Sequence, residues 1–252
     1  MQEQDRIFTN RIMDLAKASY TQNRYTFSNF LSLDEQALVD TIASDIKYVP
    51  RDSFGGHECC ERQVIRFGSQ ETLGYEENYP IVALSIEPLM EKFSDELGHR
   101  DYLGAIMNLG IKRNVVGDII LKGKKAYVFC LEEIADYICS EITRIKHTSV
   151  MVKRVDGEIK DLERKLESIE VLVTSPRFDA VVAALTKKSR SQTAELFREK
   201  KVLLNNRICE NNSYTLKPEN SFSIRGYGKY IYDGEGGRTR KDRVYVKLQR
   251  YV

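Results

Sequence analysis

The chain has 252 residues, 42% hydrophobic and 30% charged, which is ordinary for a soluble globular protein of one large or two to three small domains. No apolar run approaches the roughly 18 residues that a membrane-spanning helix requires. The first residues, MQEQDRIFTN, also lack the apolar centre and cleavage site of a signal peptide. We therefore expect a cytosolic protein without membrane contact.

The five cysteines are odd in number and scattered, so they predict neither a disulfide framework nor a zinc site. The run His57-Glu58-Cys59-Cys60 could supply two or three metal ligands, but no second cluster completes a tetrahedral site. We expect reduced thiols, no metal and no cofactor.

Charge is distributed unevenly along the chain. Residues 171–252 hold 17 of the 39 Lys and Arg residues but only 8 of the 37 Asp and Glu residues. A cationic surplus at one end of a chain favours a polyanionic partner, although chance enrichment of a solvated face gives the same count.

Residues 1–76 predict an N-terminal α/β domain that begins with a helix. Ile12, Leu15 and Ala16 share one helical face, and Ser32-x-x-Glu35 is a capping box that opens a second helix. Residues 62–67 then alternate as a strand does. This part of the chain carries no recognisable catalytic motif.

Residues 77–154 show a different rhythm. The predicted order is a strand at 81–86, a helix that includes Leu103 and Ile106, strands at 118–121 and 126–131, a helix around Ile138, and a strand at 149–152. This β-α-β-β-α-β order predicts a ferredoxin-like plait within an α+β fold. Many RNA-binding modules use this plait, but a fold alone does not establish a function.

The strand at 126–131 has two interpretations. Tyr127 and Phe129 share one face, as aromatic residues that stack on RNA bases would. Ala126, Val128 and Cys130 make the other face apolar too, which favours a strand buried on both sides.

Residues 155–171 are rich in charge and predict a connector to the third domain, residues 172–252. There, Phe178, Val181, Val182 and Leu185 predict the inner face of a short helix. Ser189-x-x-Gln192 is a capping box for a second helix, in which we expect Ala194 and Phe197 to face inward.

A β-hairpin should follow this helix. Residues 202–204 and 207–209 predict its strands, and Asn205-Asn206 predicts a tight turn. The cations that remain outside would line one surface able to bind phosphates, and Ser, Gln and Asn would add polar contacts.

This pattern resembles the S-four RNA-binding domain, named after a small-subunit ribosomal protein. The resemblance rests on RFD at 177–179, SRSQ at 189–192, KVLLNNR at 201–207 and KPENSFSI at 217–224. Lys200 and Asn206 stand where that family usually has glycine. The pattern and the resemblance together predict the following RNA-binding residues: Arg177, Lys188, Ser189, Arg190, Gln192, Arg198, Lys200, Lys201, Asn205, Arg207, Arg238, Arg240 and Lys241.

Most of the chain resembles the YlmH-like proteins, which have an N-terminal domain, a plait and a C-terminal S-four module. The run GHRDYLGAIMNLGIKR at 98–113 resembles their plait motif, and GRTRKDR at 237–243 resembles their basic C-terminal tail. Within the plait, His99, Arg100, Lys112 and Arg113 are candidates for a second RNA contact.

The resemblance implies a monomer that binds ribosomal RNA and tRNA on the large ribosomal subunit. It also implies engagement of stalled peptidyl-tRNA complexes in ribosome-associated quality control, with support of alanine tailing, and no catalysis. A cell-division-linked RNA-binding adaptor is an alternative, because some family genes lie in cell-division clusters.

An enzyme is the other alternative. His99-Arg100-Asp101 resembles a kinase loop, but Ile106 stands where that loop needs a metal-binding Asn. Pseudouridine synthases also carry S-four modules, yet they insert a Leu between Arg and Asp and usually place the module first. Tyrosyl-tRNA synthetases place it last, but their ATP-binding signatures are missing here. Asp101 can instead stabilise a helix N-terminus.

Overall fold

A computed structural model describes residues 3–157, 159, 162, 166–205, 207–240 and 242–251. The chain forms two compact units, residues 1–163 and residues 164–252. Among the described residues, no helix is both long enough and apolar enough to cross a membrane.

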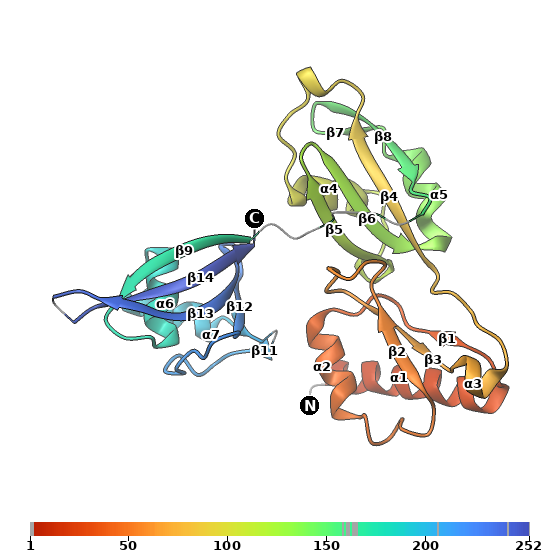
Figure 1. Cartoon of the computed structure of the whole chain (residues 1–252), viewed down its shortest axis with the longest axis horizontal. Coiled ribbons are helices and arrows are strands. Elements are labelled where there is room, and N and C mark those ends of the chain that lie inside the picture. The colour runs from red at the N-terminus through yellow and green to blue at the C-terminus, as the bar shows by residue number, and fades with distance from the viewer. Residues whose placement is uncertain are drawn as a thin grey trace. The chain divides into compact units, whose positions relative to one another are not determined.

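The first part of unit 1 combines helices with a small antiparallel sheet of strand order β1-β3-β2 (Figure 1). Its elements are α1 (Glu3–Gln22), β1 (Thr26–Phe27), α2 (Leu33–Thr41), β2 (Arg51–Phe54), β3 (Val64–Phe67) and α3 (Gln70–Leu73). The predicted capping box opens α2, because Ser32 Oγ accepts a hydrogen bond from Glu35 N at 3.3 Å and Glu35 Oε2 accepts one from Ser32 N at 2.7 Å.

The second part of unit 1 contains the predicted order β-α-β-β-α-β. Its elements are β4 (Ile81–Pro88), η1 (Glu91–Phe93), α4 (His99–Asn108), η2 (Arg113–Val115), β5 (Val116–Lys122), β6 (Lys125–Leu131), α5 (Glu132–Glu141), β7 (Arg144–Ile145) and β8 (Thr148–Arg154). The strands form one antiparallel sheet in the order β5-β6-β4-β8-β7. Apolar side chains of α4 and α5, such as Tyr102 and Ile138, are buried against one face of this sheet.

The other face of this sheet is covered by the N-terminal part of the chain. Phe129 of β6 is fully buried in a cluster with Phe30 and Val64. Val128 and Cys130, which alternate with Phe129, are fully buried on the opposite face. The interpretation of this strand as buried on both sides is confirmed, and the interpretation of Phe129 as an RNA-stacking residue is wrong.

Arg62 joins these two parts through backbone hydrogen bonds. Its Nε donates to Val116 O at 3.2 Å, and its Nη2 donates to Phe30 O at 3.0 Å. Gly117 is needed beside them, since a Cβ there would lie 2.7 Å from Phe30 Cε1. Each part thus has a core cluster of its own, and a third cluster, which includes Phe30 and Phe129, is shared across the boundary expected near residue 76.

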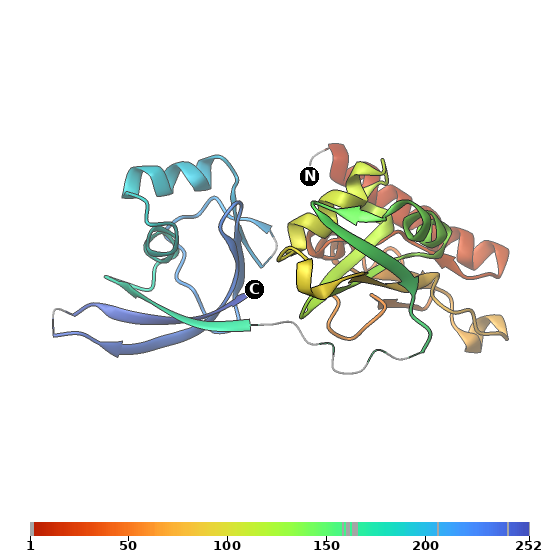
Figure 2. The ribbon, with the colours of Figure 1, turned by 90° about the horizontal axis from the view of Figure 1, so that it is seen from above.

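Unit 2 contains one antiparallel sheet in the order β11-β10-β12-β13-β14-β9, with two helices packed on it (Figure 2). Its elements are β9 (Leu166–Val173), α6 (Phe178–Thr186), α7 (Arg190–Arg198), β10 (Val202–Leu204), β11 (Arg207–Ile208), β12 (Ser221–Ile224), β13 (Gly228–Arg238) and β14 (Val244–Tyr251). The two helices and the β10–β11 hairpin lie where the sequence predicts them, while Asn206 lies outside the described residues.

Two sequence interpretations of unit 2 differ from the structure. Residues 166–171 belong to β9, which pairs with β14 from Leu166↔Tyr251 to Val173↔Val244, and are not a connector. Residues 237–243 are not a tail either, because β13 and β14 form a hairpin and Thr239 N donates to Arg243 O at 2.8 Å at its turn.

The helical phase of α7 also differs from the prediction. Phe197 is buried as expected, but Ala194 is exposed, and Thr193 and Leu196 are the other buried residues. A polar threonine in the core explains this error, since Thr193 Oγ1 donates to Ser189 O at 2.9 Å and so satisfies its hydroxyl locally.

Candidate nucleic-acid interface

The N-terminus of α7 is the centre of the predicted RNA-binding residues. Ser189 Oγ accepts from Gln192 N at 3.4 Å, and Gln192 Oε1 accepts from Ser189 N at 3.1 Å. These two predicted contact residues therefore cap the helix with one another. Their capping fixes the position of Arg190, which is exposed in the first turn of α7.

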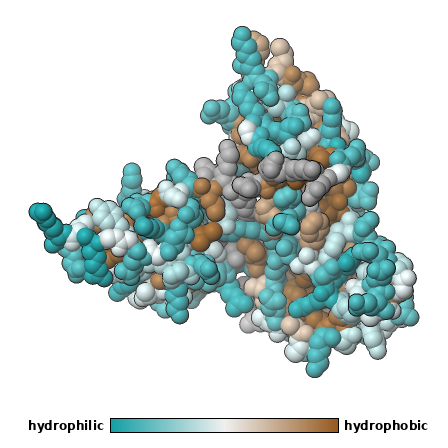
Figure 3. Space-filling view, viewed as in Figure 1, coloured by the Kyte–Doolittle hydropathy of each residue, from teal (hydrophilic) through white to brown (hydrophobic). Residues whose placement is uncertain are grey.

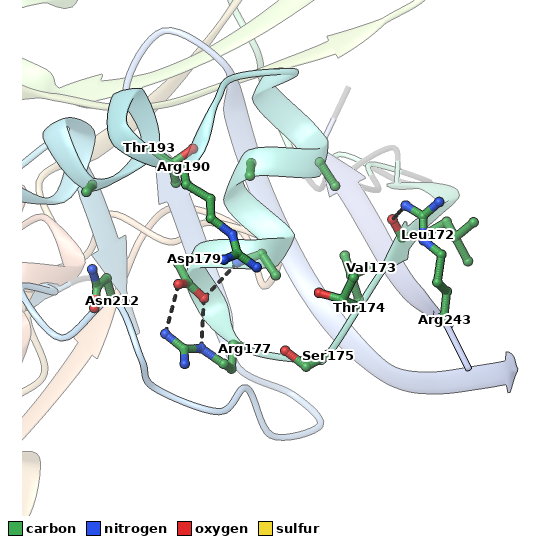
Figure 4. Close-up of a pocket in the computed structure, with 14 residues that line it drawn as sticks. Leu172, Val173, Thr174, Ser175, Arg177, Asp179, Arg190, Thr193, Asn212 and Arg243 are labelled. Carbon is green, nitrogen blue, oxygen red and sulfur yellow. Dashed lines mark hydrogen bonds and ion pairs between the residues drawn. The ribbon is translucent and has the colours of Figure 1, made fainter. Parts of the chain in front are cut away.

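Three arginines surround a hollow of about 440 Å³ beside this turn, Arg177, Arg190 and Arg243 (Figure 4). Arg177 is oriented by Asp179, to which its Nε and Nη2 donate at 3.1 and 2.9 Å. Arg243 Nη2 donates to Leu172 O at 3.4 Å. Guanidinium groups fixed in this way present planar donors that suit phosphate oxygens.

Arg243 is a lining residue that the sequence prediction missed. It precedes β14, in which Val244, Val246 and Leu248 are buried and alternate with more exposed residues. That alternation in the sequence is the signal that could have revealed a strand and placed Arg243 in the folded sheet rather than in a tail.

A second group of predicted residues lies along another side of α7 and just beyond its two ends. Lys188, Gln192 and Lys201 line a separate hollow of about 330 Å³ together with Glu195 and Glu199. Arg190 and Thr193 line the first hollow, so the predicted residues do not form a single stripe along this helix.

The cations at the end of α7 form ion pairs on the surface. Arg198 lies 2.7 Å from Glu195, Lys201 lies 2.7 Å from Glu199, and Lys200 lies 3.9 Å from Glu210. The hydrogen bond from Lys201 lowers the pKa of the Glu199 carboxyl and raises the pKa of the Lys201 amine. Exposed pairs of this kind contribute little stability, so these cations can exchange a carboxylate for a phosphate at low cost.

The remaining predicted residues of unit 2 lie on two hairpins. Asn205 has a φ of 46° at the β10–β11 turn, and its Oδ1 accepts from Ser221 N at 3.0 Å, while Arg207 is exposed. On the β13–β14 hairpin, Arg238 lies 2.8 Å from Asp242 and Arg240 is exposed. Lys241 lies outside the described residues.

The four candidates for a second RNA contact are not brought together. His99 and Arg100 are exposed in the first turn of α4, whereas Lys112 follows its other end. A helix of ten residues is about 15 Å long. His99 and Arg100 can therefore share a contact with each other but not with Lys112.

Arg113 has a structural position that the sequence prediction did not anticipate. Its Nη1 donates to Val116 O and, at 3.1 Å, to Gly117 O. Burial, with the neighbouring Arg62 charge, lowers the pKa of Arg113 to about 10. The guanidinium is thus half-buried and hydrogen-bonded to the backbone of unit 1, a structural role, and RNA contact by Arg113 stays a prediction.

Asp101 also has a structural position. Its Oδ2 accepts from Gly98 N at 2.8 Å and lies 2.8 Å from Lys146 Nζ. The Lys146 hydrogen bond, followed by that from Gly98, lowers the pKa of the Asp101 carboxyl. The sequence interpretation of Asp101 as a residue that stabilises a helix N-terminus is confirmed.

The segment considered for metal binding contains an internal hydrogen-bond pair instead of a ligand cluster. His57 Nδ1 lies 3.0 Å from Cys59 Sγ, and His57 Nε2 lies 3.2 Å from Ile159 O. The part of the chain that the structure describes contains no group of three or more His, Cys, Asp or Glu side chains that could hold a metal ion. All five cysteines are free thiols.

Residues 75–158 match the family model described as "Putative RNA-binding domain in YlmH". The chain is homologous to the YlmH-like proteins. A relative in Bacillus subtilis (strain 168), "Ribosome-associated protein quality control protein P2", is 25% identical over 249 residues, which are 98% of this chain and 95% of the relative. A solved structure, "Cell division protein ylmH from Streptococcus pneumoniae", is 18% identical with a TM-score of 0.49 and covers 62% of this chain and 93% of that one.

The YlmH match coincides with the sheet β5-β6-β4-β8-β7 and the helices packed on it, including the predicted motif at 98–113. The whole-chain match to the Bacillus relative extends the likeness to YlmH-like proteins across both units. RNA binding is what the description of the family model names, and ribosome-associated quality control is what the name of the Bacillus relative states.

Proposed function

We propose that this protein binds ribosomal RNA and tRNA on the large ribosomal subunit and engages stalled peptidyl-tRNA complexes, supporting alanine tailing. In this proposal unit 2 is an S-four-type RNA-binding domain and the plait of unit 1 is ferredoxin-like. The observation that carries the proposal is the hollow bordered by Arg177, Arg190 and Arg243 beside the capped start of α7. The name of the Bacillus relative supports the assignment to ribosome quality control.

Phosphate binding explains why these arginines lie outside the core. Each phosphate that the protein neutralises releases counterions, so affinity should fall steeply with salt, by roughly 0.7 to 0.9 log units per contact and per log unit of salt. A ribosome that carries tRNA would offer RNA to both units at once, and their linkage would raise affinity without a new type of contact.

Sedimentation of the full chain with ribosomal particles tests the proposal. Large subunits that hold peptidyl-tRNA should carry more protein down a sucrose gradient than empty subunits. The Arg190→Glu variant should bind about tenfold more weakly, because a charge-assisted hydrogen bond is lost and a carboxylate faces phosphate. Glu195→Lys, which changes a charge in the same helix, is the matched control and should bind at least as well as wild type.

A full chain that stays at the top of every gradient at physiological salt would contradict the ribosome assignment. The same result for Arg190→Glu and Glu195→Lys would instead contradict the assignment of the contact to the arginine-lined hollow.

We also propose that the protein performs no covalent chemistry. The engagement of Asp101 with Gly98 and Lys146 supports this view over a pseudouridine-synthase type of activity. Mass spectrometry of bulk RNA and of ATP after incubation with the protein should find no modified nucleoside and no released nucleoside diphosphate. Product that disappears in the Asp101→Asn variant would show that the protein is an enzyme.

A further inference from the structure

Three apolar side chains project into solvent after β4. Leu89, Met90 and Phe93 expose 60%, 63% and 73% of their surfaces, and Phe93 ends the short helix η1. We call these three residues the wedge. Apolar side chains gathered on an exposed loop are a frequent mark of an interaction site. Figure 3 shows apolar residues among hydrophilic ones at this end of unit 1.

The loop that carries the wedge is fastened at several points. Lys124 Nζ donates to Glu91 O at 2.5 Å and to Ser94 Oγ at 3.0 Å. Leu89 N donates to Ser149 O at 3.0 Å on the other side. These hydrogen bonds hold the loop in place, so the wedge side chains are exposed because the fold positions them toward solvent.

Asp95 fastens the same loop to the turn between β7 and β8. Its Oδ2 accepts from His147 N at 3.1 Å, and its backbone N donates to Thr148 Oγ1 at 2.8 Å. Three segments thus meet at this end of the plait: the loop of the wedge, the β5–β6 hairpin turn and the β7–β8 turn.

Cations border the wedge on these three segments. Residues 87–101, 122–125 and 144–148 hold seven Lys and Arg side chains against five carboxylates. Two ion pairs, Glu87 with Lys125 and Asp101 with Lys146, use two members of each set, so the surplus of two cations is unchanged, and Asp95 accepts from the backbone. Lys92 lies 5.8 Å from the Phe93 ring centroid, and Arg144 is exposed.

We propose that the wedge inserts among unpaired nucleotides of RNA, with the Phe93 ring stacked on a base and Lys92 and Arg144 on the flanking phosphates. This inference rests on the proposed RNA-binding function and assigns the contact made by the plait. An apolar wedge with flanking cations suits unstacked bases, which offer a π-face beside each phosphate. The wedge lies within the residues that match the RNA-binding family model, and Phe129, the other aromatic candidate there, is buried.

Binding of the full chain to two RNAs tests the proposal. One probe is a hairpin with a uridine loop, and the other is the same stem as a blunt duplex. Wild type should prefer the hairpin, and Phe93→Ala should lose about tenfold in affinity for the hairpin while binding the duplex as before. Phe93→Tyr should restore hairpin binding, and Lys92→Ala should lower the salt slope on the hairpin by roughly 0.7.

Two variants provide the comparison. Ile7→Ala removes a side chain of α1 that is 63% exposed, equal to Met90, and should change neither affinity. Arg190→Glu should weaken binding to both RNAs equally, because it acts through unit 2. All substituted side chains are exposed, and equal thermal midpoints will show that each variant is folded.

The outcomes distinguish a failure of the wedge proposal from a failure of the proposed RNA-binding function. If Phe93→Ala binds both RNAs as wild type does while Arg190→Glu is weakened, the wedge proposal is wrong and the function stands. Binding of neither RNA by wild type would contradict both. A Phe93→Ala defect seen with whole ribosomes but with neither probe nor protein-free ribosomal RNA would indicate a protein partner. A defect seen only in flotation with phosphatidylglycerol vesicles would indicate a lipid surface. Either result overturns the RNA proposal.

Discussion

The two units of this protein use arginine in opposite ways. In unit 1, Arg62 and Arg113 donate to backbone carbonyls where the N-terminal part meets the plait, and burial lowers the pKa of both. In unit 2, Arg177 and Arg190 are exposed at the border of a hollow. The same residue type joins two parts of a core in one unit and lies at an exposed surface in the other. A count of cations therefore does not locate an RNA surface until burial is known.

The comparison predicts that the plait will not fold without the N-terminal part. A fragment of residues 77–154 would expose Ile120, Phe129 and Leu131, which are at most 7% exposed in the intact chain. Loss of that burial should destabilise the fragment by roughly 5 kcal/mol or more. Denaturation followed by circular dichroism should show a cooperative transition for residues 1–163 and none for 77–154. An equally cooperative transition in both fragments would show that the plait folds without the N-terminal part and would contradict this prediction.

Unit 2, by contrast, should fold alone if β9 is retained. A fragment of residues 164–252 keeps all eight β9–β14 residue pairs, whereas residues 172–252 lose six of them and the packing of Ile169 and Val171. We expect the shorter fragment to be less stable by about 4 kcal/mol and prone to associate through the open edge of β14. Chemical denaturation and light scattering of both fragments measure this difference. Equal stability would mean that β9 is dispensable.

Replacing a half-buried arginine that bonds to backbone carbonyls should lower the free energy of unfolding. Arg62→Met leaves the carbonyls of Phe30 and Val116 without this donor, so we expect unit 1 to lose about 3 kcal/mol in the free energy of unfolding. Arg100→Met, at an exposed position of α4, is the matched control and should change stability by no more than about 0.5 kcal/mol. Urea denaturation of residues 1–163 measures both free energies of unfolding. Similar losses of stability in Arg62→Met and Arg100→Met would contradict a special role for the hydrogen bonds of Arg62.

The smallest expected effect concerns an exposed cation in unit 2. Lys200 has a φ of 56°, a left-handed conformation that costs a side chain about 1 kcal/mol relative to glycine. Lys200→Gly should therefore raise the stability of residues 164–252 by about that amount. If Lys200 also contacts phosphate, the slope of log affinity for RNA against log salt concentration should be shallower in the variant by roughly 0.7 to 0.9. Lower stability of the variant would show that the ion pair of Lys200 with Glu210 contributes more than the left-handed backbone conformation costs.

The sequence alone predicted the features that depend on near neighbours. The capping boxes at Ser32 and Ser189 formed as expected because each needs only a side chain and a backbone group three residues apart. The β-α-β-β-α-β order of the plait was also predictable, since it follows from apolar periodicity within each element.

Tertiary structure decided which surfaces remain outside. Arg113 became half-buried and bonded to the backbone of β5, beside the charge of Arg62, which lies some fifty residues earlier in the sequence. Residues 166–171 became a strand because β14, some eighty residues later, supplies the partner groups. Pairing of β14 with β13 turned an expected tail into a hairpin, and Arg243 at its end lines the same hollow as Arg177. Burial and strand pairing depend on contacts between distant segments, and local patterns do not contain that information.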